Sequence, residues 1–254
     1  MSDQVELLLK SLRLPTFIQH YQRLSDEANE QHWSHIDYLG ALCEYELSDR
    51  YQRRVRNWTR EACLPAGKTF ASLQFDELAK PDRQPVKHLM QNREWWHRSE
   101  NVVLIGASGV GKSHIAASLG HQLIEHNVRC KMFPAVALVQ ELQKAKEGLE
   151  LMTFMTRLDK YRVIIIDDIG YVKKTDAETQ VLFEFIAHRY ESGSLVITAN
   201  QAFSEWDAIF PDNIMTVAAV DRLVHHATII KFDGDSFRKK EQQTRKTTKQ
   251  NRPS

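Results

Sequence analysis

The sequence GASGVGKS at residues 106–113 constrains this chain more than any other feature, because it matches the pattern G-x-x-x-x-G-K-[ST] in full. It follows the apolar run 102–105 and precedes a helical pattern, which is the strand–loop–helix context that the motif requires. Its glycines allow backbone N–H groups to turn inward around phosphate oxygens at a helix N-terminus. We therefore predict a site for ATP and Mg²⁺ made by Gly106, Ala107, Ser108, Gly109, Val110, Gly111, Lys112 and Ser113.

Within this site, Lys112 is expected to bind the β- and γ-phosphates, and the Ser113 hydroxyl to ligate Mg²⁺. A second apolar run, 163–166, ends in Asp167 and Asp168. A carboxylate at the end of a buried strand beside a phosphate loop is suited to hold Mg²⁺, so Asp167 is predicted as a metal ligand. Asp168 is then the candidate base that polarises the attacking water.

From about residue 100, the alternation of short apolar runs with amphipathic segments predicts a doubly wound α/β domain. Short apolar runs at 102–105, 130–133, 163–167, 195–198 and 229–232 alternate with amphipathic segments near 112–126, 136–146, 149–159, 176–191 and 217–226. Strands that are apolar at every residue indicate a parallel sheet covered on both faces.

The first 65 residues predict a small all-helical domain. Apolar residues recur at spacings of three and four, and Ser34 with Asp37 fits a helix capping box. The segment 66–100 is expected to be a connector, 101–234 the nucleotide-binding domain and 235–254 a basic tail.

Two polar positions late in the chain have both a functional and a purely structural interpretation. Asn200 follows the run 195–198, where an amide could position the lytic water, but a loop asparagine that caps the next turn fits equally well. Arg222 follows Asp221 in an otherwise apolar helix, which is compatible with a salt bridge or with an arginine supplied to a neighbouring subunit's nucleotide.

The net charge is +1, with 34 basic and 33 acidic residues, but the basic residues are unevenly distributed. An arginine run within 50–60 contains no acid, and the final segment 235–254 is also rich in Lys and Arg. This asymmetry predicts a polyanion partner, with duplex DNA bound through phosphates and largely without sequence preference; solvated surface arginines and a solubility tail are the alternatives. The candidate DNA contacts are Arg50, Arg53, Arg54, Arg56, Arg60, Lys239 and Lys240.

No apolar run reaches the length of a membrane-spanning helix, and the N-terminus lacks the layout of a signal peptide. Cys43, Cys63 and Cys130 form no CxxC pair, so a cytoplasmic protein without membrane contact or disulfides is expected. The histidine pairs at 225–226 and at 32 and 35 have no Cys or carboxylate at ligand spacing nearby in the sequence, which predicts roles other than metal binding.

Taken together in their order and spacing, these motifs resemble those of AAA+ ATPases of the DnaC/DnaA clade. The resembling features are the phosphate loop, the Asp-Asp strand, Thr198-Ala199-Asn200 and Asp221-Arg222. The leucine-rich N-terminal helices and the ending KFDGDSFR at 231–238 resemble more narrowly the IstB family, helper ATPases encoded beside a transposase in bacterial insertion sequences.

The resemblance implies a five-stranded AAA+ core in which Asn200 is a sensor and Arg222 an arginine finger acting in trans. It also implies an additional helix after the second strand, here within 135–158, which favours spiral over flat-ring assembly and lies near DNA. Asp168 stands where the more usual pair has glutamate, which leaves the assignment of the base open. Few residues follow Phe232, so the usual helical lid is not expected, and Arg238 is a substitute candidate for a second sensor.

Together with the motifs, this resemblance implies an ATPase that forms a homo-oligomer, spiral or ring, on duplex DNA, with ATP at subunit interfaces, and that assists a partner transposase in target capture. The nearest rival is a DnaC-type replicative helicase loader that acts with single-stranded DNA. A P-loop kinase for a small metabolite would leave the helical N-terminal region and Arg222 without a role. An architectural DNA binder with a degenerate site is at odds with intact Lys112, Ser113 and Asp167.

Overall fold

The computed structural model describes residues 2–170, 175–208 and 213–233, and it divides into two compact units, residues 1–58 and 59–254. The predicted tail, with Arg238, Lys239 and Lys240, lies outside the described residues.

The first unit is helical, as the periodicity predicts. It consists of α1 (Ser2–Ser11), α2 (Pro15–Glu30) and most of α3 (His35–Glu61), whose last residues belong to the second unit. The predicted capping box opens α3: the Asp37 N–H donates to Ser34 Oγ at 3.1 Å, and the Ser34 N–H donates to Asp37 Oδ2 at 3.2 Å.

A buried carboxylate joins α2 to α3 within this unit. Glu46, only 4 % exposed, accepts a hydrogen bond from the Thr16 N–H at 3.0 Å and one from Arg50 Nε at 2.7 Å. Thr16 lies in the first turn of α2, where unpaired N–H groups and the helix dipole favour a negative charge. Burial alone would raise the pKa of Glu46, but these partners hold it below its ordinary value.

The second unit is built on a five-stranded parallel sheet with the order β2-β3-β4-β1-β5. The strands are β1 (Asn101–Gly106), β2 (Cys130–Pro134), β3 (Val163–Asp167), β4 (Ser194–Ala199) and β5 (Ala227–Phe232). The interiors of β1, β3 and β4 are fully buried, which explains why they are apolar at successive positions rather than alternating.

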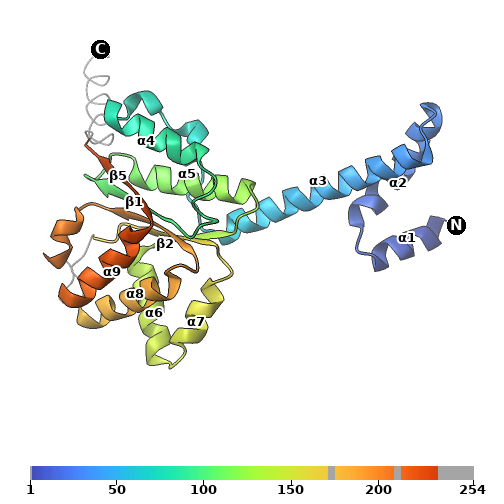
Figure 1. Ribbon diagram of the computed structural model, residues 1–254. Coiled ribbons are helices and arrows are strands. Elements are labelled where there is room, and N and C mark those ends of the chain that lie inside the picture. Colours follow the sequence, from blue (N-terminus) through green and yellow to red (C-terminus); the bar gives the residue numbers. More distant parts are fainter. Residues whose placement is uncertain (1, 171–174, 209–212, 234–254) are drawn as a thin grey trace, which may run out of the picture. The chain divides into compact units, whose positions relative to one another are not determined.

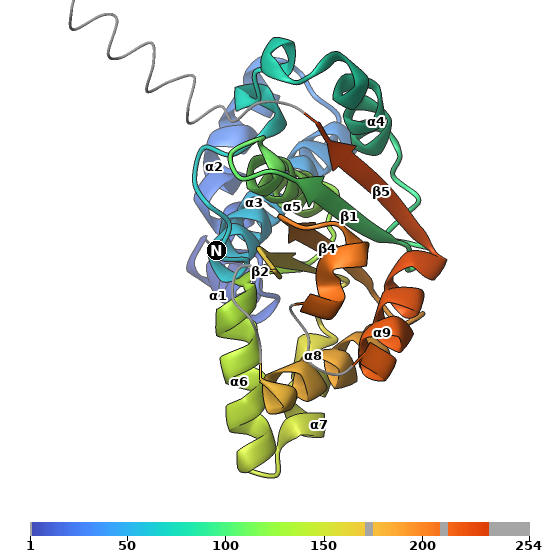
Figure 2. The same cartoon turned by 90° about the vertical axis from the view of Figure 1, so that its left-hand side faces the viewer.

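Helices cover both faces of the sheet (Figures 1 and 2). On one face lie α5 (Lys112–Glu125) and α4 (Lys80–Gln91); on the other lie α6 (Ala135–Glu147), α8 (Asp176–Arg189) and α9 (Asn213–His225). The hydrophobic core between the sheet and α6, α8 and α9 includes Leu138, Leu182, Trp206 and Leu223, together with strand residues such as Ile164. The short 3₁₀ turns are η1 (Phe70–Ser72), η2 (Phe75–Glu77) and η3 (Phe203–Ala208).

The expected insertion after the second strand is present as a pair of helices. Helix α6 is followed by α7 (Leu151–Leu158), and both precede β3. Leu149, between the two helices, is 95 % exposed, and Met152 is 63 % exposed. The fold therefore has the predicted doubly wound core with the additional helices in the predicted segment.

Because the sheet is parallel, all of its strands end at the same edge, and the strand order makes β3, β4 and β1 neighbours there. β1 lies between β4 and β5, and its register pairs Ile105 with Ala199 of β4, while Ile166 of β3 pairs with Ile197 of β4. The phosphate loop, the Asp-Asp pair and Asn200 therefore follow neighbouring strands at the same carboxyl edge. In parallel α/β sheets, ligands bind at this edge, where the strand order changes direction.

Candidate nucleotide-binding site

The phosphate loop runs from the end of β1 to the start of α5 and contains three glycines with positive φ. At Gly106 a β-carbon would lie 2.6 Å from the Phe232 carbonyl oxygen, so no side chain fits where the loop passes β5. Gly111 precedes the first residue of α5 with φ 100°, a left-handed conformation that side chains disfavour. These conformations make the tight turn that brings the α5 N-terminus to the mouth of the loop.

Lys112 is held by oxygen atoms around the loop. Its Nζ donates to the carbonyl oxygens of Gly106 at 2.6 Å and Ala107 at 2.8 Å, and to Asn200 Oδ1 at 2.9 Å. Lys112 is 6 % exposed and lines the cavity, so its positive charge is poorly screened by solvent there. An ammonium group at this position is suited to bind phosphate oxygens.

Ser113 and Asp167 place two oxygen ligands side by side. Ser113 Oγ donates to Asp167 Oδ1 at 2.8 Å, although the two residues come from α5 and β3. A hydroxyl and a carboxylate at this separation match the hard oxygen ligands that Mg²⁺ prefers. The donor set therefore fits the predicted magnesium ion.

Thr198 connects the two acidic residues, a role that the sequence did not assign. Its Oγ1 donates to Asp167 Oδ1 at 2.6 Å and accepts from the Asp168 N–H at 2.8 Å. Asp168 has φ 65°, a left-handed conformation that is uncommon outside glycine. Its side chain thereby reaches Asn200, whose Nδ2 donates to Asp168 Oδ1 at 2.7 Å.

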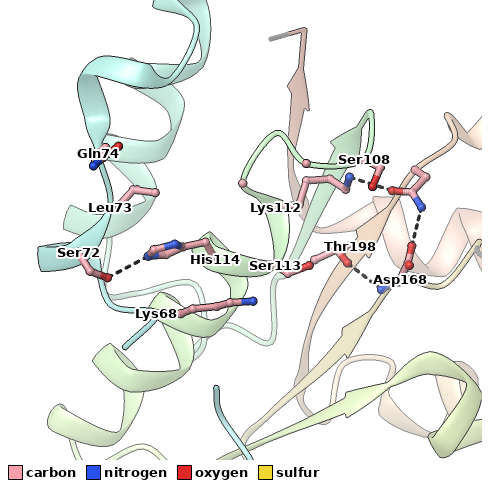
Figure 3. A pocket seen from close by; sticks show the side chains of 13 residues that line it. Lys68, Ser72, Leu73, Gln74, Ser108, Lys112, Ser113, His114, Asp168 and Thr198 are labelled. Atoms are coloured by element: carbon pink, nitrogen blue, oxygen red, sulfur yellow. Dashed lines mark hydrogen bonds between the residues drawn. The ribbon is translucent and has the colours of Figure 1, made fainter. Parts of the chain in front are cut away.

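These groups line a cavity of about 490 Å³, within the range of small-ligand sites. Figure 3 shows Lys112, Thr198 and Asp168 on one side of it and residues of the 68–74 segment on the other. The lining residues are Lys68, Ser72, Leu73, Gln74, Ser108, Gly109, Gly111, Lys112, Ser113, His114, Asp168, Thr198 and Asn200.

Lys68, Ser72, Leu73 and Gln74 form a wall of the cavity that the sequence does not predict, because the segment 66–100 has only the features of a connector. His114, which follows Ser113, attaches the segment to α5: its Nε2 lies 3.0 Å from the Thr69 carbonyl oxygen and 3.1 Å from Ser72 Oγ. The short sequence Thr69–Ser72 forms a capping box around η1. That box was the one local signal that the segment adopts a defined shape beside the loop.

Arg222 lies apart from this cavity. It is exposed on α9, where its Nη1 donates to the Ala218 carbonyl oxygen at 3.2 Å, and it is absent from the cavity lining. Helix α9 leads into the amino end of β5 (Figure 2). Arg222 is in the last turn of α9, so it lies toward the edge of the sheet opposite the phosphate loop. The structure thus separates Arg222 from the chain's own site.

The candidate DNA-binding arginines of α3 differ in their surroundings. Arg50 and Arg53 both approach the buried Glu46, Arg50 at 2.7 Å and Arg53 at 3.5 Å, so they have a structural partner in the first unit. Arg54 lies over the rings of Tyr51 and Trp58, and Arg56 is exposed. Arg60 is exposed and belongs to the second unit.

Comparison with known proteins finds one matching family. The model of the family described as IstB-like ATP binding protein matches residues 7–245. An insertion-sequence ATP-binding protein of Sinorhizobium fredii is 42% identical over 92% of this chain and 78% of its own length. An ATP-binding protein of insertion sequence IS21 from Pseudomonas aeruginosa is 32% identical over 94% of this chain and 89% of its own length.

Among solved structures, the DnaC helicase loader is similar in fold, with a TM-score of 0.52, 17% identity, and coverage of 61% of this chain and 93% of that one. The prediction of an AAA+ core with a parallel five-stranded sheet is confirmed. Within the described residues, no helix is both long and apolar enough to cross a membrane.

Proposed function

The chain belongs to the family of IstB-like ATP-binding proteins of insertion sequences, and from this premise we propose that it hydrolyses ATP with Mg²⁺ while assembled on duplex DNA. In this proposal the assembly presents target DNA to the transposase encoded by the same element, in the cytoplasm. The observation that carries the proposal is the convergence of Lys112, Ser113, Asp167, Asp168 and Asn200 at one sheet edge.

Different residues of the site bind the phosphates, hold the metal ion and accept the proton during hydrolysis. The loop N–H groups and Lys112 bind the phosphates, and Ser113 and Asp167 hold the metal ion. Bound Mg²⁺ neutralises charge on the β- and γ-phosphates. Asp168 would accept the proton of the attacking water. Asn200, which contacts both Lys112 and Asp168, holds that carboxylate in place.

Arg222 is proposed to act on the nucleotide of a neighbouring subunit. Its exposure and its distance from the chain's own cavity support this role, because a guanidinium that acts in trans must project from the surface. Such an arginine stabilises the charge of the transition state at an interface. Hydrolysis is then coupled to assembly, since the catalytic set is complete only when two copies meet.

Duplex DNA is proposed to bind through phosphates, with Arg54, Arg56 and Arg60 as the contacts on α3 and the basic tail as a further contribution. Arg50 and Arg53 are weaker candidates, because both have Glu46 as a partner. The sequence favours no base-reading element, so affinity is expected to fall steeply with salt and to vary little with sequence.

The relatives favour transposition over the alternative of a helicase loader. The similarity to DnaC concerns the fold at 17% identity, whereas the relatives at 42% and 32% identity are insertion-sequence proteins. Affinity capture with purified transposase and with purified replicative helicase separates the two functions. Retention of the transposase supports the proposal, and retention of the helicase alone contradicts it.

A further inference from the structure

Two turns at the amino edge of the sheet bring together three side chains that ligate metals in other proteins. Glu191 lies in the turn between α8 and β4, His225 is the last residue of α9, and His226 lies between α9 and β5. One ligand atom from each of the three lies within 4.8 Å of the others, and all three residues are exposed. The sequence alone predicted no metal here, because the carboxylate comes from a different part of the chain.

The backbone beneath both turns is fixed by buried hydrogen bonds. Asn101 at the start of β1 donates its N–H to the His226 carbonyl oxygen at 2.7 Å and its Nδ2 to the Leu223 carbonyl oxygen at 3.1 Å. Its Oδ1 accepts from the Leu195 N–H at 2.9 Å, so one buried side chain ties the start of β4 to the end of α9. The two turns are therefore held beside each other by the fold.

The turn that carries Glu191 is fixed from the other side by a buried arginine. Arg189, 2 % exposed, donates to the carbonyl oxygens of Tyr161 at 3.0 Å and Arg162 at 2.9 Å. Its backbone oxygen accepts from the Gly193 N–H at 3.1 Å, which closes the turn around Glu191. Glu191 itself has φ 57°, a left-handed conformation that the closed turn imposes on a residue with a side chain.

One of the two imidazoles is already oriented. Tyr190 Oη and His225 Nδ1 are 2.8 Å apart. With that hydrogen bond in place, Nε2 is the ring nitrogen of His225 that would bind an ion. Such a second hydrogen bond is the usual way in which a ligating histidine is held in one tautomer and orientation. The rings of His225 and His226 are 4.1 Å apart between centroids.

The chemistry of this set selects the class of ion. Two imidazole nitrogens and one carboxylate suit zinc and related divalent transition metals, with a fourth position left for water, whereas Mg²⁺ and Ca²⁺ prefer oxygen ligands alone. We propose that Glu191, His225 and His226 form a binding site for a divalent transition-metal ion of the zinc type. Such an ion joins the α8–β4 turn to the end of α9, the helix that carries Arg222.

Calorimetric titration of the full-length, nucleotide-free protein with zinc chloride tests the site. The expected result is one zinc ion per chain that binds more tightly than any other. His225→Ala, His226→Ala and Glu191→Gln should each weaken this binding by at least about tenfold, the lower bound seen for disturbing even an outer partner of a metal site. Cobalt chloride should give the visible absorption of a four-coordinate ion in the wild type and lose it in the double variant H225A/H226A.

Two control variants separate this site from other zinc-binding groups. The double variant H32A/H35A removes the other histidine pair, and Asp167→Asn removes the carboxylate of the nucleotide site; both should retain wild-type zinc affinity. Unchanged nucleotide affinity and far-ultraviolet circular dichroism verify that H225A/H226A is folded. Wild-type zinc affinity in H225A/H226A, or loss of the tight site in either control, overturns the proposal.

Discussion

Lys112 and Asn200 are joined by a hydrogen bond of 2.9 Å between Nζ and Oδ1, although 88 residues separate them in the sequence. Asn200 also donates to Asp168 at 2.7 Å, so a single amide contacts both the phosphate-binding cation and the candidate base. The amide oxygen faces the ammonium group and the amide nitrogen faces the carboxylate, which is the one orientation that satisfies both. This arrangement makes Asn200 the position where binding and turnover are separable.

Asn200→Ala should lower the rate of ATP hydrolysis by about 100- to 1,000-fold, the range for loss of one preorganised polar group in an active site. Nucleotide affinity should change far less, because the loop and Ser113 remain. Turnover measured beside equilibrium binding of a fluorescent ATP analogue checks this. A parallel loss of affinity and rate would assign Asn200 to binding instead.

Asp167→Asn should weaken Mg²⁺ binding, whereas Asp168→Asn should lower the rate of hydrolysis. Asp167 shares a hydrogen bond with Ser113 and is the proposed metal ligand, so its amide variant should need much more Mg²⁺ for half-maximal nucleotide binding. Asp168→Asn should bind MgATP normally and turn over at least about 100-fold more slowly, because a general base is lost. Titrations of Mg²⁺ for both variants distinguish the two roles, and identical behaviour would contradict the assignment.

Arg222→Ala should retain nucleotide binding by the isolated chain and lose turnover by about 10³-fold or more, as for other arginines supplied in trans. The sharper test is to mix Arg222→Ala with Lys112→Ala. Because each variant then supplies what the other lacks at a shared interface, ATPase activity should reappear on mixing. Arg98→Ala, which changes another exposed arginine, should retain full activity. Absence of any recovery in the mixture counts against action in trans.

DNA affinity should fall when Arg54 or Arg56 is replaced by alanine, to the same extent on unrelated duplex sequences. Each loss of a phosphate contact should reduce the slope of log K against log salt by about one. Arg23→Ala on α2, which removes an exposed i,i+4 pair with Glu27, is the matched control and should leave the slope unchanged. A slope that is flat in the unmodified protein contradicts phosphate-driven binding altogether.

Stability should depend on pH through Glu61, which ends α3 inside the second unit. Burial tends to raise its pKa, but hydrogen bonds from Lys160 at 2.7 Å, Arg129 at 2.6 Å and Tyr161 at 2.8 Å lower that pKa to about 2, from an ordinary value of 4.5. A carboxylate with a lowered folded-state pKa stabilises the fold above pH 4.5, and the contribution disappears as the pH falls toward 2.

Glu61→Gln should therefore reduce the free energy of unfolding by about 2 kcal/mol at pH 7, a value kept modest because the pairs are partly exposed. The difference between variant and wild type should shrink between pH 4.5 and pH 2. Denaturant titrations at several pH values measure this difference in the free energy of unfolding. Glu147→Gln, on the exposed side of α6, is the control and should show no such dependence on pH. A difference that does not vary with pH would show that the charge of Glu61 is not the cause.

The sequence predicts the sheet and the phosphate side of the site because both depend on local patterns. Strands buried on both faces must be apolar at successive residues, so each predicted run falls within one or two residues of a strand: 163–167 coincides with β3, and 102–105 lies within β1. The phosphate loop needs its glycines at fixed spacing, and Gly106 shows why, since Phe232 leaves no room for a side chain.

The features of the site that the sequence does not predict depend on contacts between distant parts of the chain. The cavity wall at Lys68, Leu73 and Gln74 comes from a segment without periodicity, and only the fold brings it to the α5 N-terminus through His114. Thr198 lies in the motif Thr198-Ala199-Asn200, yet its hydrogen bonds to Asp167 and Asp168 depend on the register between β3 and β4. Likewise, Glu191 joins His225 and His226 only because two turns share the amino edge of the sheet.

In the proposed function, ATP held by Lys112 orders several copies of the chain along duplex DNA. Electron microscopy and sedimentation velocity of the wild type and of Lys112→Ala, each with duplex DNA and with or without ATP, test it most directly. We predict regular oligomers for the wild type only when ATP and DNA are both present, and none for the variant, which should also lose nucleotide binding. ATP-dependent oligomers of Lys112→Ala, or a wild type that stays monomeric under every condition, would contradict the claim.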